Sequence, residues 1–118
     1  MSNILIIGAG SMGTAFSFPC SDKNHKVTIL GTQLEDDFID EISYKKFHPS
    51  LGVIIPNSVK FKRFDKLKEE LKKKIDLLVI AVSSKGIEWI SSELGKELKK
   101  KVSILVLTKG LSVHKKNS

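Results

Sequence analysis

Three glycines directly after a short apolar run constrain this 118-residue chain more than any other feature. Residues 3–7 read Asn-Ile-Leu-Ile-Ile, and Gly8, Gly10 and Gly13 follow them with the spacing G-x-G-x-x-G. A continuous apolar run rich in β-branched residues is typical of a strand that is buried on both faces. Because the residues from Thr14 onward are compatible with a helix, this segment predicts a strand, a tight glycine turn and a helix start.

Four more apolar runs alternate with amphipathic stretches along the chain. We expect further strands at residues 26–30, 59–61, 76–82 and 102–107, and helices after Thr32, over 65–74 and over 85–101. Residues 48–57 contain two prolines and a glycine, so we expect a loop there. Strands that alternate with helices and lack polar positions predict one α/β domain with a doubly wound parallel sheet of about five strands.

Three residues predict how the helices of the first half begin and end. Proline removes a backbone hydrogen bond and crowds the preceding turn, so we expect the first helix to kink or end early at Pro19. Asn24 is expected to close this helix in a left-handed conformation, which asparagine tolerates. Thr32 is expected to cap the next helix, whose first turn is acidic and therefore suits the helix dipole.

In this setting the glycine motif is the fingerprint of a Rossmann-like, dinucleotide-binding fold. Gly8 permits the tight turn, Gly10 lets the backbone approach a pyrophosphate, and Gly13 lets helix and strand pack closely. The start of the helix adds unpaired N–H groups and the positive end of the helix dipole. We therefore expect NAD or NADP to bind here, and a glycine turn without a ligand is the alternative.

The sequence leaves the choice between NAD and NADP open. NAD-preferring folds place an acidic residue about 20 residues further on, at the end of the second strand, where it holds the ribose 2′-hydroxyl. That position reads Leu30-Gly31-Thr32-Gln33, and Glu35 comes only later. No arginine is present in this segment to bind a 2′-phosphate either.

The net charge of +7 comes almost entirely from lysine, because Arg63 is the only arginine. Nucleic-acid-binding surfaces usually combine arginines and aromatic residues with the charge. Here the lysines cluster at residues 66–68, 72–74 and 99–101, among apolar residues at helical spacing. We interpret them as solvated helix faces and expect no nucleic-acid partner.

Cysteine usage and hydropathy indicate a cytoplasmic protein without a membrane partner. Cys20 is the only cysteine, so the chain forms no internal disulfide. No apolar run approaches the ~20 residues that a membrane span needs, and no signal-peptide pattern is present. The three histidines lack the spacing of metal ligands, so we expect no metal site. The sequence shows no nucleophile placed beside a base, so we find no constellation for nucleophilic catalysis.

Five segments, in the same order, resemble NAD(P)-dependent glycerol-3-phosphate dehydrogenase. Residues 8–15, Gly-Ala-Gly-Ser-Met-Gly-Thr-Ala, resemble the family's opening G-A-G-S-[aromatic]-G-T-A. Residues 108–111, Thr-Lys-Gly-Leu, match its T-K-G-[LI] segment, which distinguishes the family from other dehydrogenases. Residues 25–30, 47–49 with 55–56, and 81–84 resemble its second strand, its F-L-P…L-P loop and its A-V-P-S turn.

The resemblance implies roles for single residues. Ser11 and Met12 would contact the dinucleotide phosphates, and Thr32 would lie at the adenosine ribose. Ser84, in the turn after the fourth strand, would belong to the cofactor site. Lys109 would lie near both the nicotinamide and the phosphorylated substrate, where a cation attracts dihydroxyacetone phosphate or glycerol 3-phosphate and polarises a carbonyl.

The family's chains are much longer, and their catalytic lysine lies in a helical C-terminal domain. The resemblance therefore implies that residues 1–118 are a truncated NAD(P)-binding Rossmann domain and that the catalytic and substrate domain is absent from them. The intact enzyme would reduce dihydroxyacetone phosphate to sn-glycerol 3-phosphate with NAD(P)H, with a homodimer as one arrangement, and this chain alone would be inactive. The alternatives are another Rossmann dehydrogenase, similar to ketopantoate reductase or a hydroxyacyl dehydrogenase, and a non-catalytic NAD(P)-sensing module.

Overall fold

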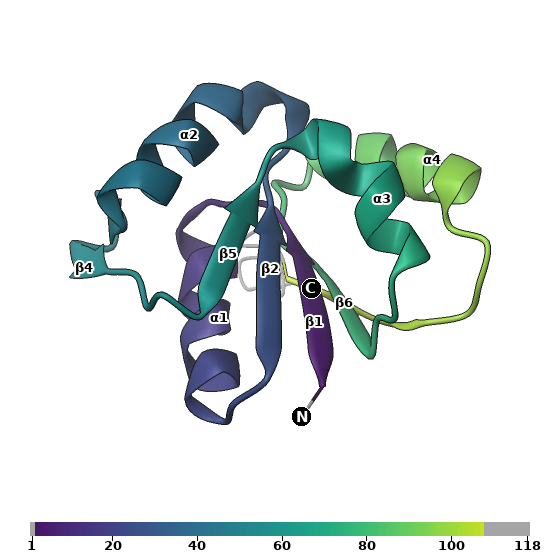
Figure 1. The fold of residues 1–118 in the computed structure, drawn as a ribbon. Coiled ribbons are helices and arrows are strands. Elements are labelled where there is room, and N and C mark those ends of the chain that lie inside the picture. The colour runs from purple at the N-terminus through teal and green to yellow at the C-terminus, as the bar shows by residue number, and fades with distance from the viewer. Residues whose placement is uncertain (1, 108–118) are drawn as a thin grey trace, which may run out of the picture.

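The computed structural model describes residues 2–107, which form a parallel five-stranded sheet with helices on both faces (Figure 1). The strand order is β5-β2-β1-β6-β7. The strands are β1 (Asn3–Ile7), β2 (Lys26–Leu30), β5 (Val59–Lys62), β6 (Leu77–Ile80) and β7 (Ser103–Val106). The helices are α1 (Ser11–Asp22), α2 (Asp36–Lys45), α3 (Leu67–Lys72) and α4 (Gly86–Glu97). The predicted α/β class and doubly wound parallel sheet are confirmed.

Two apolar layers hold the helices against the sheet. Alternate residues of β1 point to opposite faces, so Ile4 and Ile6 belong to one layer and Leu5 and Ile7 to the other. Helices α1 and α2 cover the first face, and α3 and α4 cover the second (Figure 1). The central strands β1 and β6 are therefore buried on both sides, which explains why their sequences are almost entirely apolar.

The strand order reverses beside β1. The chain proceeds from β1 outward to β2 and β5 and then returns to β6 on the other side of β1. Ile7 pairs with Leu30 of β2 and with Ile80 of β6, so the carboxyl ends of these three strands meet at one edge of the sheet. Open α/β sheets bind their ligands outside the carboxyl ends of the strands, where the order reverses.

The sequence predicted that helix α1 would kink or end early at Pro19. The helix does not end early, so that part of the prediction was wrong. The helix continues through Pro19 to Asp22, because Phe18 and Cys20 on either side of the proline pack against the sheet. Asn24 adopts the predicted left-handed conformation, with φ 64°, and its N–H donates to Ser21 at 2.9 Å. The prediction that Asn24 closes α1 in a left-handed conformation is therefore confirmed.

Residues 48–57 are more ordered than the expected loop. The short strands β3 (Phe47–His48) and β4 (Val53–Ile54) form an antiparallel pair in which His48 lies opposite Val53. Two-residue strands have too little periodicity to be recognised in a sequence, and the two prolines and the glycine pointed to a loop.

Two helices are shorter than predicted. Helix α3 is preceded by the 3-10 turn η2 (Phe64–Lys66) and ends at Lys72, because Lys73 is extended, with ψ 168°. Helix α4 ends at Glu97, and Leu98 is extended, with φ −84° and ψ 113°. At both places the chain has to turn back toward the next strand of the sheet.

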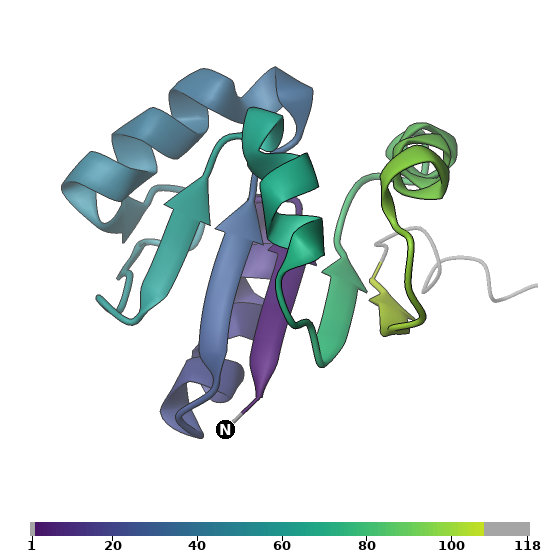
Figure 2. The ribbon, with the colours of Figure 1, turned by 45° about the vertical axis from the view of Figure 1, so that its right-hand side comes forward.

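Strand β7 lies at the outer edge of the sheet (Figure 2). Its side chains Ile104, Leu105 and Val106 are exposed, with relative exposures of 49%, 37% and 43%. Within residues 2–107, no helix has both the length and the apolar content that a membrane span requires.

Candidate dinucleotide-binding site

The first glycine of the motif makes the turn between β1 and α1. Gly8 has φ +114°, a conformation that side chains rarely adopt, and its N–H donates to the Leu30 carbonyl at 2.8 Å. A Cβ at this position would lie 2.1 Å from the carbonyl oxygen of Ala81. The turn is therefore held tightly between the ends of β2 and β6, and only glycine fits there.

The other two glycines have opposite surroundings. A Cβ on Gly13 would lie 2.3 Å from the Gly8 carbonyl oxygen and 3.1 Å from the Ala81 Cβ, so this glycine lets α1 approach the sheet. A Cβ on Gly10 would meet no protein atom within 4 Å. Gly10 is exposed and has ordinary dihedral angles, φ −69° and ψ −175°. The protein itself therefore does not require glycine at position 10.

The N-terminus of α1 presents free backbone donors. No side chain caps it, and no acidic residue lies in its first turn. Thr14 is the first residue whose N–H bonds back into the helix, to the Gly10 carbonyl at 3.0 Å. The amides of Ser11 and Met12, before it, lack an acceptor within the helix, and together with the helix dipole they form a site for an anion.

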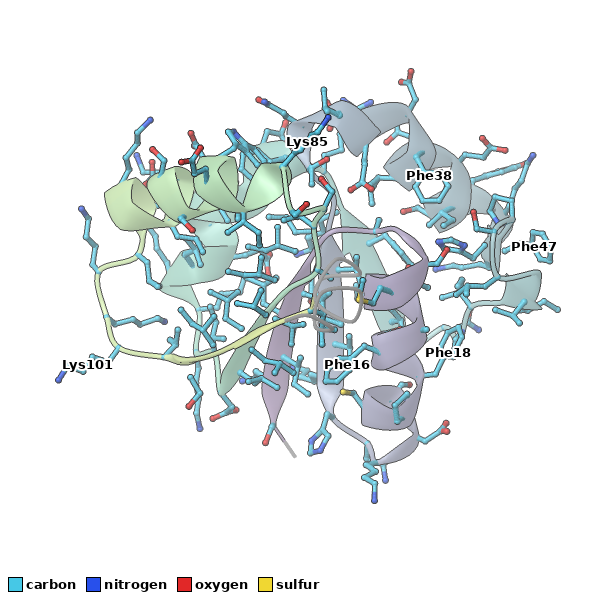
Figure 3. The ribbon with its side chains drawn as sticks, turned by 180° about the vertical axis from the view of Figure 1, so that it is seen from behind. Phe16, Phe18, Phe38, Phe47, Lys85 and Lys101 are labelled. Carbon is cyan, nitrogen blue, oxygen red and sulfur yellow. The ribbon has the colours of Figure 1, made fainter. Side chains whose placement is uncertain are left out.

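A cleft of about 580 Å³ lies at the carboxyl ends of β1, β2 and β6. This volume is within the range of small-molecule and cofactor sites. One wall is formed by the residues that come after β2 in the chain. The other is formed by the residues that come after β6, and it includes Lys85 at the start of α4 (Figure 3). The lining residues are Gly8, Gly10, Thr32, Gln33, Leu34, Glu35, Ala81, Val82, Ser83, Lys85, Gly86 and Trp89.

The peptide groups on either side of Ala9 are held by three other parts of the chain. The Ala9 N–H donates to Oε1 of Glu35 at 3.1 Å. The Ala9 carbonyl accepts from Oγ1 of Thr14 at 3.1 Å and lies 3.0 Å from Nε2 of His48. These bonds fix the glycine turn from α1, from the segment after β2 and from the β3–β4 pair.

His48 is 1% exposed, and its ring meets Phe38 edge-on with centroids 5.3 Å apart. The N–H of Leu51 donates to Nδ1 of His48 at 3.3 Å, which makes Nδ1 the acceptor. We therefore assign the proton to Nε2, which donates it to the Ala9 carbonyl. A buried donor of this kind fixes the position of the carbonyl.

Several of the residues predicted to bind the cofactor come together here. Gly8, Gly10 and Thr32 line the cleft, and Ser11 and Met12 form the first turn of α1 beside it. Ser84 is exposed in the turn after β6, whereas its neighbour Ser83 lines the cleft. Lys109, predicted to bind both cofactor and substrate, lies outside the described residues.

Sequence reasoning missed three residues of the site. Glu35 lies in the 3-10 turn η1 (Gln33–Glu35), and its Oε1 accepts the N–H of Thr32 at 2.8 Å. The spacing T-x-x-E was the available signal, because it is typical of a capping box. Trp89 lines the cleft and also packs against Phe64, with ring centroids 4.8 Å apart. For His48 no signal existed.

Among the described residues, no group of three or more acidic, histidine or cysteine side chains is placed to hold a metal ion. The charged side chains that line the cleft are Glu35 on one wall and Lys85 on the other. The start of α1 offers backbone amides, Lys85 and Glu35 add one charge of each sign, and Leu34, Val82 and Trp89 contribute apolar surface.

Comparison with known proteins finds relatives among the glycerol-3-phosphate dehydrogenases. The NADP(+)-dependent glycerol-3-phosphate dehydrogenase of Archaeoglobus fulgidus is 32% identical over 91 residues, which are 77% of this chain and 27% of that protein. A glycerol-3-phosphate dehydrogenase [NAD(P)+] of Geobacillus kaustophilus is 31% identical over 122 residues, covering 100% of this chain and 34% of that protein. The chain thus spans about a third of the length of these relatives.

The crystal structure of glycerol-3-phosphate dehydrogenase from Coxiella burnetii has the same fold. It superposes with a TM-score of 0.79 and 25% identity, covering 92% of this chain and 32% of that one. The sequence model described as the N-terminus of NAD-dependent glycerol-3-phosphate dehydrogenase matches residues 3–118. The chain therefore belongs to the NAD-dependent glycerol-3-phosphate dehydrogenase family and corresponds to its N-terminal region.

Proposed function

We propose that this chain is the dinucleotide-binding part of a glycerol-3-phosphate dehydrogenase and that it binds NAD or NADP in the cleft beside β1, β2 and β6. The observation that carries the proposal is the open space at Gly10 next to the uncapped start of α1. A pyrophosphate needs both a backbone without a Cβ and free N–H donors. Family membership supports the same cofactor and favours this dehydrogenase over the ketopantoate reductase alternative.

The residues present fit the parts of a dinucleotide. The amides of Ser11 and Met12 would donate to the pyrophosphate, and the segment at Thr32 would lie at the adenosine ribose. Trp89 and Val82 offer apolar surface to a ring. The nicotinamide, when bound, supplies hydride transfer, and the protein supplies binding and orientation.

The reaction and partners of the intact enzyme are part of the proposal. Hydride would pass between NAD(P)H and the carbonyl carbon of dihydroxyacetone phosphate, giving sn-glycerol 3-phosphate. Lys109 would attract the substrate phosphate, and groups beyond this chain would complete the catalytic site. A cytoplasmic location, a homodimer of the intact enzyme and the absence of a nucleic-acid partner stay predictions.

Trp89 provides the experiment that tests cofactor binding. It is the only tryptophan of the chain, and it lines the cleft. Titration with NADH should quench its fluorescence saturably and transfer energy to the reduced nicotinamide, and excess NAD+ should reverse both effects. A chain that is folded by circular dichroism but shows no saturable change with NADH or NADPH would contradict the proposal.

Activity measurements separate the enzyme fragment from a non-catalytic NAD(P)-sensing module. This chain with NADH and dihydroxyacetone phosphate should show no oxidation of NADH, because the family resemblance places the catalytic lysine in the C-terminal region. The chain joined to the C-terminal region of a relative should restore turnover if it is part of the enzyme. Failure of a well-folded fusion to turn over would favour the sensing module.

A further inference from the structure

We propose that Glu35 selects between the two cofactors: it accepts the ribose 2′-hydroxyl of NAD(H) and repels the 2′-phosphate of NADP(H), so the chain prefers NAD(H). This inference rests on the proposed function, because it assigns a specificity to the same cleft. The position expected for such an acid, at the end of the second strand, is occupied by Leu30-Gly31-Thr32-Gln33. In the structure, the carboxylate of Glu35, which comes later in the chain, reaches this position and accepts the N–H of Thr32.

The placement of Glu35 is defined by two backbone amides. Its Oε1 accepts the N–H of Thr32 at 2.8 Å, at the end of β2, and the N–H of Ala9 at 3.1 Å, in the glycine turn. The carboxylate therefore bridges β2 and the glycine turn, and it lines the cleft. In sheets of this type the acid that holds the ribose 2′-hydroxyl stands at this position.

The second oxygen of Glu35 is free for a ligand. Both hydrogen bonds of this carboxylate involve Oε1, and within residues 2–107 Oε2 accepts none and forms no ion pair. A ribose hydroxyl is a donor and pairs with such an oxygen, whereas a phosphate has oxygens that only accept at neutral pH. A 2′-phosphate would thus meet a second anion instead of a donor.

The one arginine of the chain is not available to offset this repulsion. Arg63 follows β5, and its guanidinium is held by both carboxylate oxygens of Asp40, with Asp36 at 3.9 Å. The hydrogen bond from Arg63 lowers the pKa of Asp40, which keeps this pair charged at neutral pH. The cation that lines the cleft, Lys85, belongs to the opposite wall, after β6.

The substitution Glu35→Gln tests the charge while retaining the shape. Glutamine keeps an oxygen that accepts from Thr32 and Ala9, so the glycine turn should be preserved. The control is Asp37→Asn, which removes the same charge from an exposed residue two positions further on. Dissociation constants for NADH and NADPH are measured by Trp89 fluorescence at fixed ionic strength.

The unmodified chain should bind NADH about tenfold or more tightly than NADPH, and Glu35→Gln should reduce that ratio about tenfold by removing the repulsion. Asp37→Asn should leave the ratio unchanged. Equal binding of both nucleotides by the unmodified chain, or an unchanged ratio in Glu35→Gln, would overturn the inference and leave the proposed function standing. Binding of neither nucleotide by the folded chain would overturn both.

A competition experiment with the unmodified chain does not depend on the folding of the variant. Adenosine 5′-monophosphate should displace NADH more effectively than adenosine 2′,5′-bisphosphate, which differs by the 2′-phosphate alone. The reverse order would show that the cleft attracts the 2′-phosphate, and it would overturn the assignment of Glu35.

Discussion

Gly10→Ala should impair nucleotide binding while leaving the fold intact, and Gly13→Ala should lower the stability of the fold. A Cβ at position 10 meets no protein atom within 4 Å, but it would occupy the space beside the free amides of α1. A Cβ at position 13 would lie 2.3 Å from the backbone oxygen of Gly8, which is about 1 Å short of an ordinary contact.

The two magnitudes follow from these contacts. Alanine is a poorer N-cap than glycine but restricts the unfolded chain more, so Gly10→Ala should change the free energy of unfolding by less than about 1 kcal/mol. Its Cβ should weaken NADH binding at least about tenfold, since a pyrophosphate requires close backbone approach. In Gly13→Ala, the higher helix propensity of alanine adds about 1 kcal/mol to the free energy of unfolding. Overpacking of its Cβ against the backbone removes about 3 kcal/mol.

We therefore expect Gly13→Ala to lower the free energy of unfolding by about 2 kcal/mol, which corresponds to a fall in Tm of about 8 °C for a chain of this size. Thermal unfolding followed by circular dichroism gives the stabilities, and the Trp89 titration gives the NADH affinities. Gly10→Ala with unchanged NADH affinity would refute the assignment of Gly10 to the pyrophosphate. Gly13→Ala with unchanged Tm would refute the packing argument.

Three further changes test other parts of the structure. His48→Leu should lower the free energy of unfolding in urea by about 2 kcal/mol and weaken NADH binding, because the Ala9 carbonyl loses one of its two buried side-chain donors and keeps only Thr14; unchanged stability would contradict this. Burial raises the pKa of Glu70, but hydrogen bonds from Lys62 and Lys73 outweigh it and hold this pKa below its usual value. The stability that this charge contributes is therefore present above about pH 4.5 and lost as the pH falls further. Glu70→Gln should accordingly cost about 1–2 kcal/mol at pH 7 and progressively less in acid, and an equal deficit at pH 7 and pH 3.5 in urea unfolding would contradict the ion pair. Burial also raises the pKa of the Cys20 thiol, so iodoacetamide should alkylate the folded chain more slowly than the unfolded chain by mass spectrometry, and equal rates would contradict its packing.

The strands that are buried on both faces could be predicted closely from the sequence. The bounds of β1 and β2 agree with the apolar runs at residues 3–7 and 26–30. Burial on both faces favours apolar residues at consecutive positions, as at residues 4–7 and 29–30. The glycine turn was equally predictable, because Gly8 and Gly13 each answer a local steric demand.

The helix ends were less predictable because they depend on the sheet. The apolar spacing of residues 65–74 and 85–101 would allow longer helices than the structure has. Helices α3 and α4 end where the chain must turn back to reach β6 and β7, and that geometry is set by strands that lie elsewhere in the sequence. Helix α1 continues through Pro19 for a similar reason, since its packing on the sheet favours the helix over an early end.

The contacts that complete the site were not predictable because they join distant residues. Glu35 and His48 reach the peptide groups of Ala9 from 26 and 39 residues away. Neither carries a local motif that names Ala9 as its partner. Such bonds appear only when the sheet order and the β3–β4 pair are known, so the fold had to be seen before the site could be described.

The central claim, that the cleft at the glycine turn holds the dinucleotide, is tested most directly by a residue-resolved NMR titration of the chain with NADH. The amide signals of Ala9, Gly10, Ser11, Met12 and Thr32 should shift saturably with one common dissociation constant. Amides at the opposite edge of the sheet, where β1 and β2 begin, such as those of Asn3 and Lys26, should stay unchanged. Shifts confined to that opposite edge, or spread over the exposed lysines without saturation, would contradict the account.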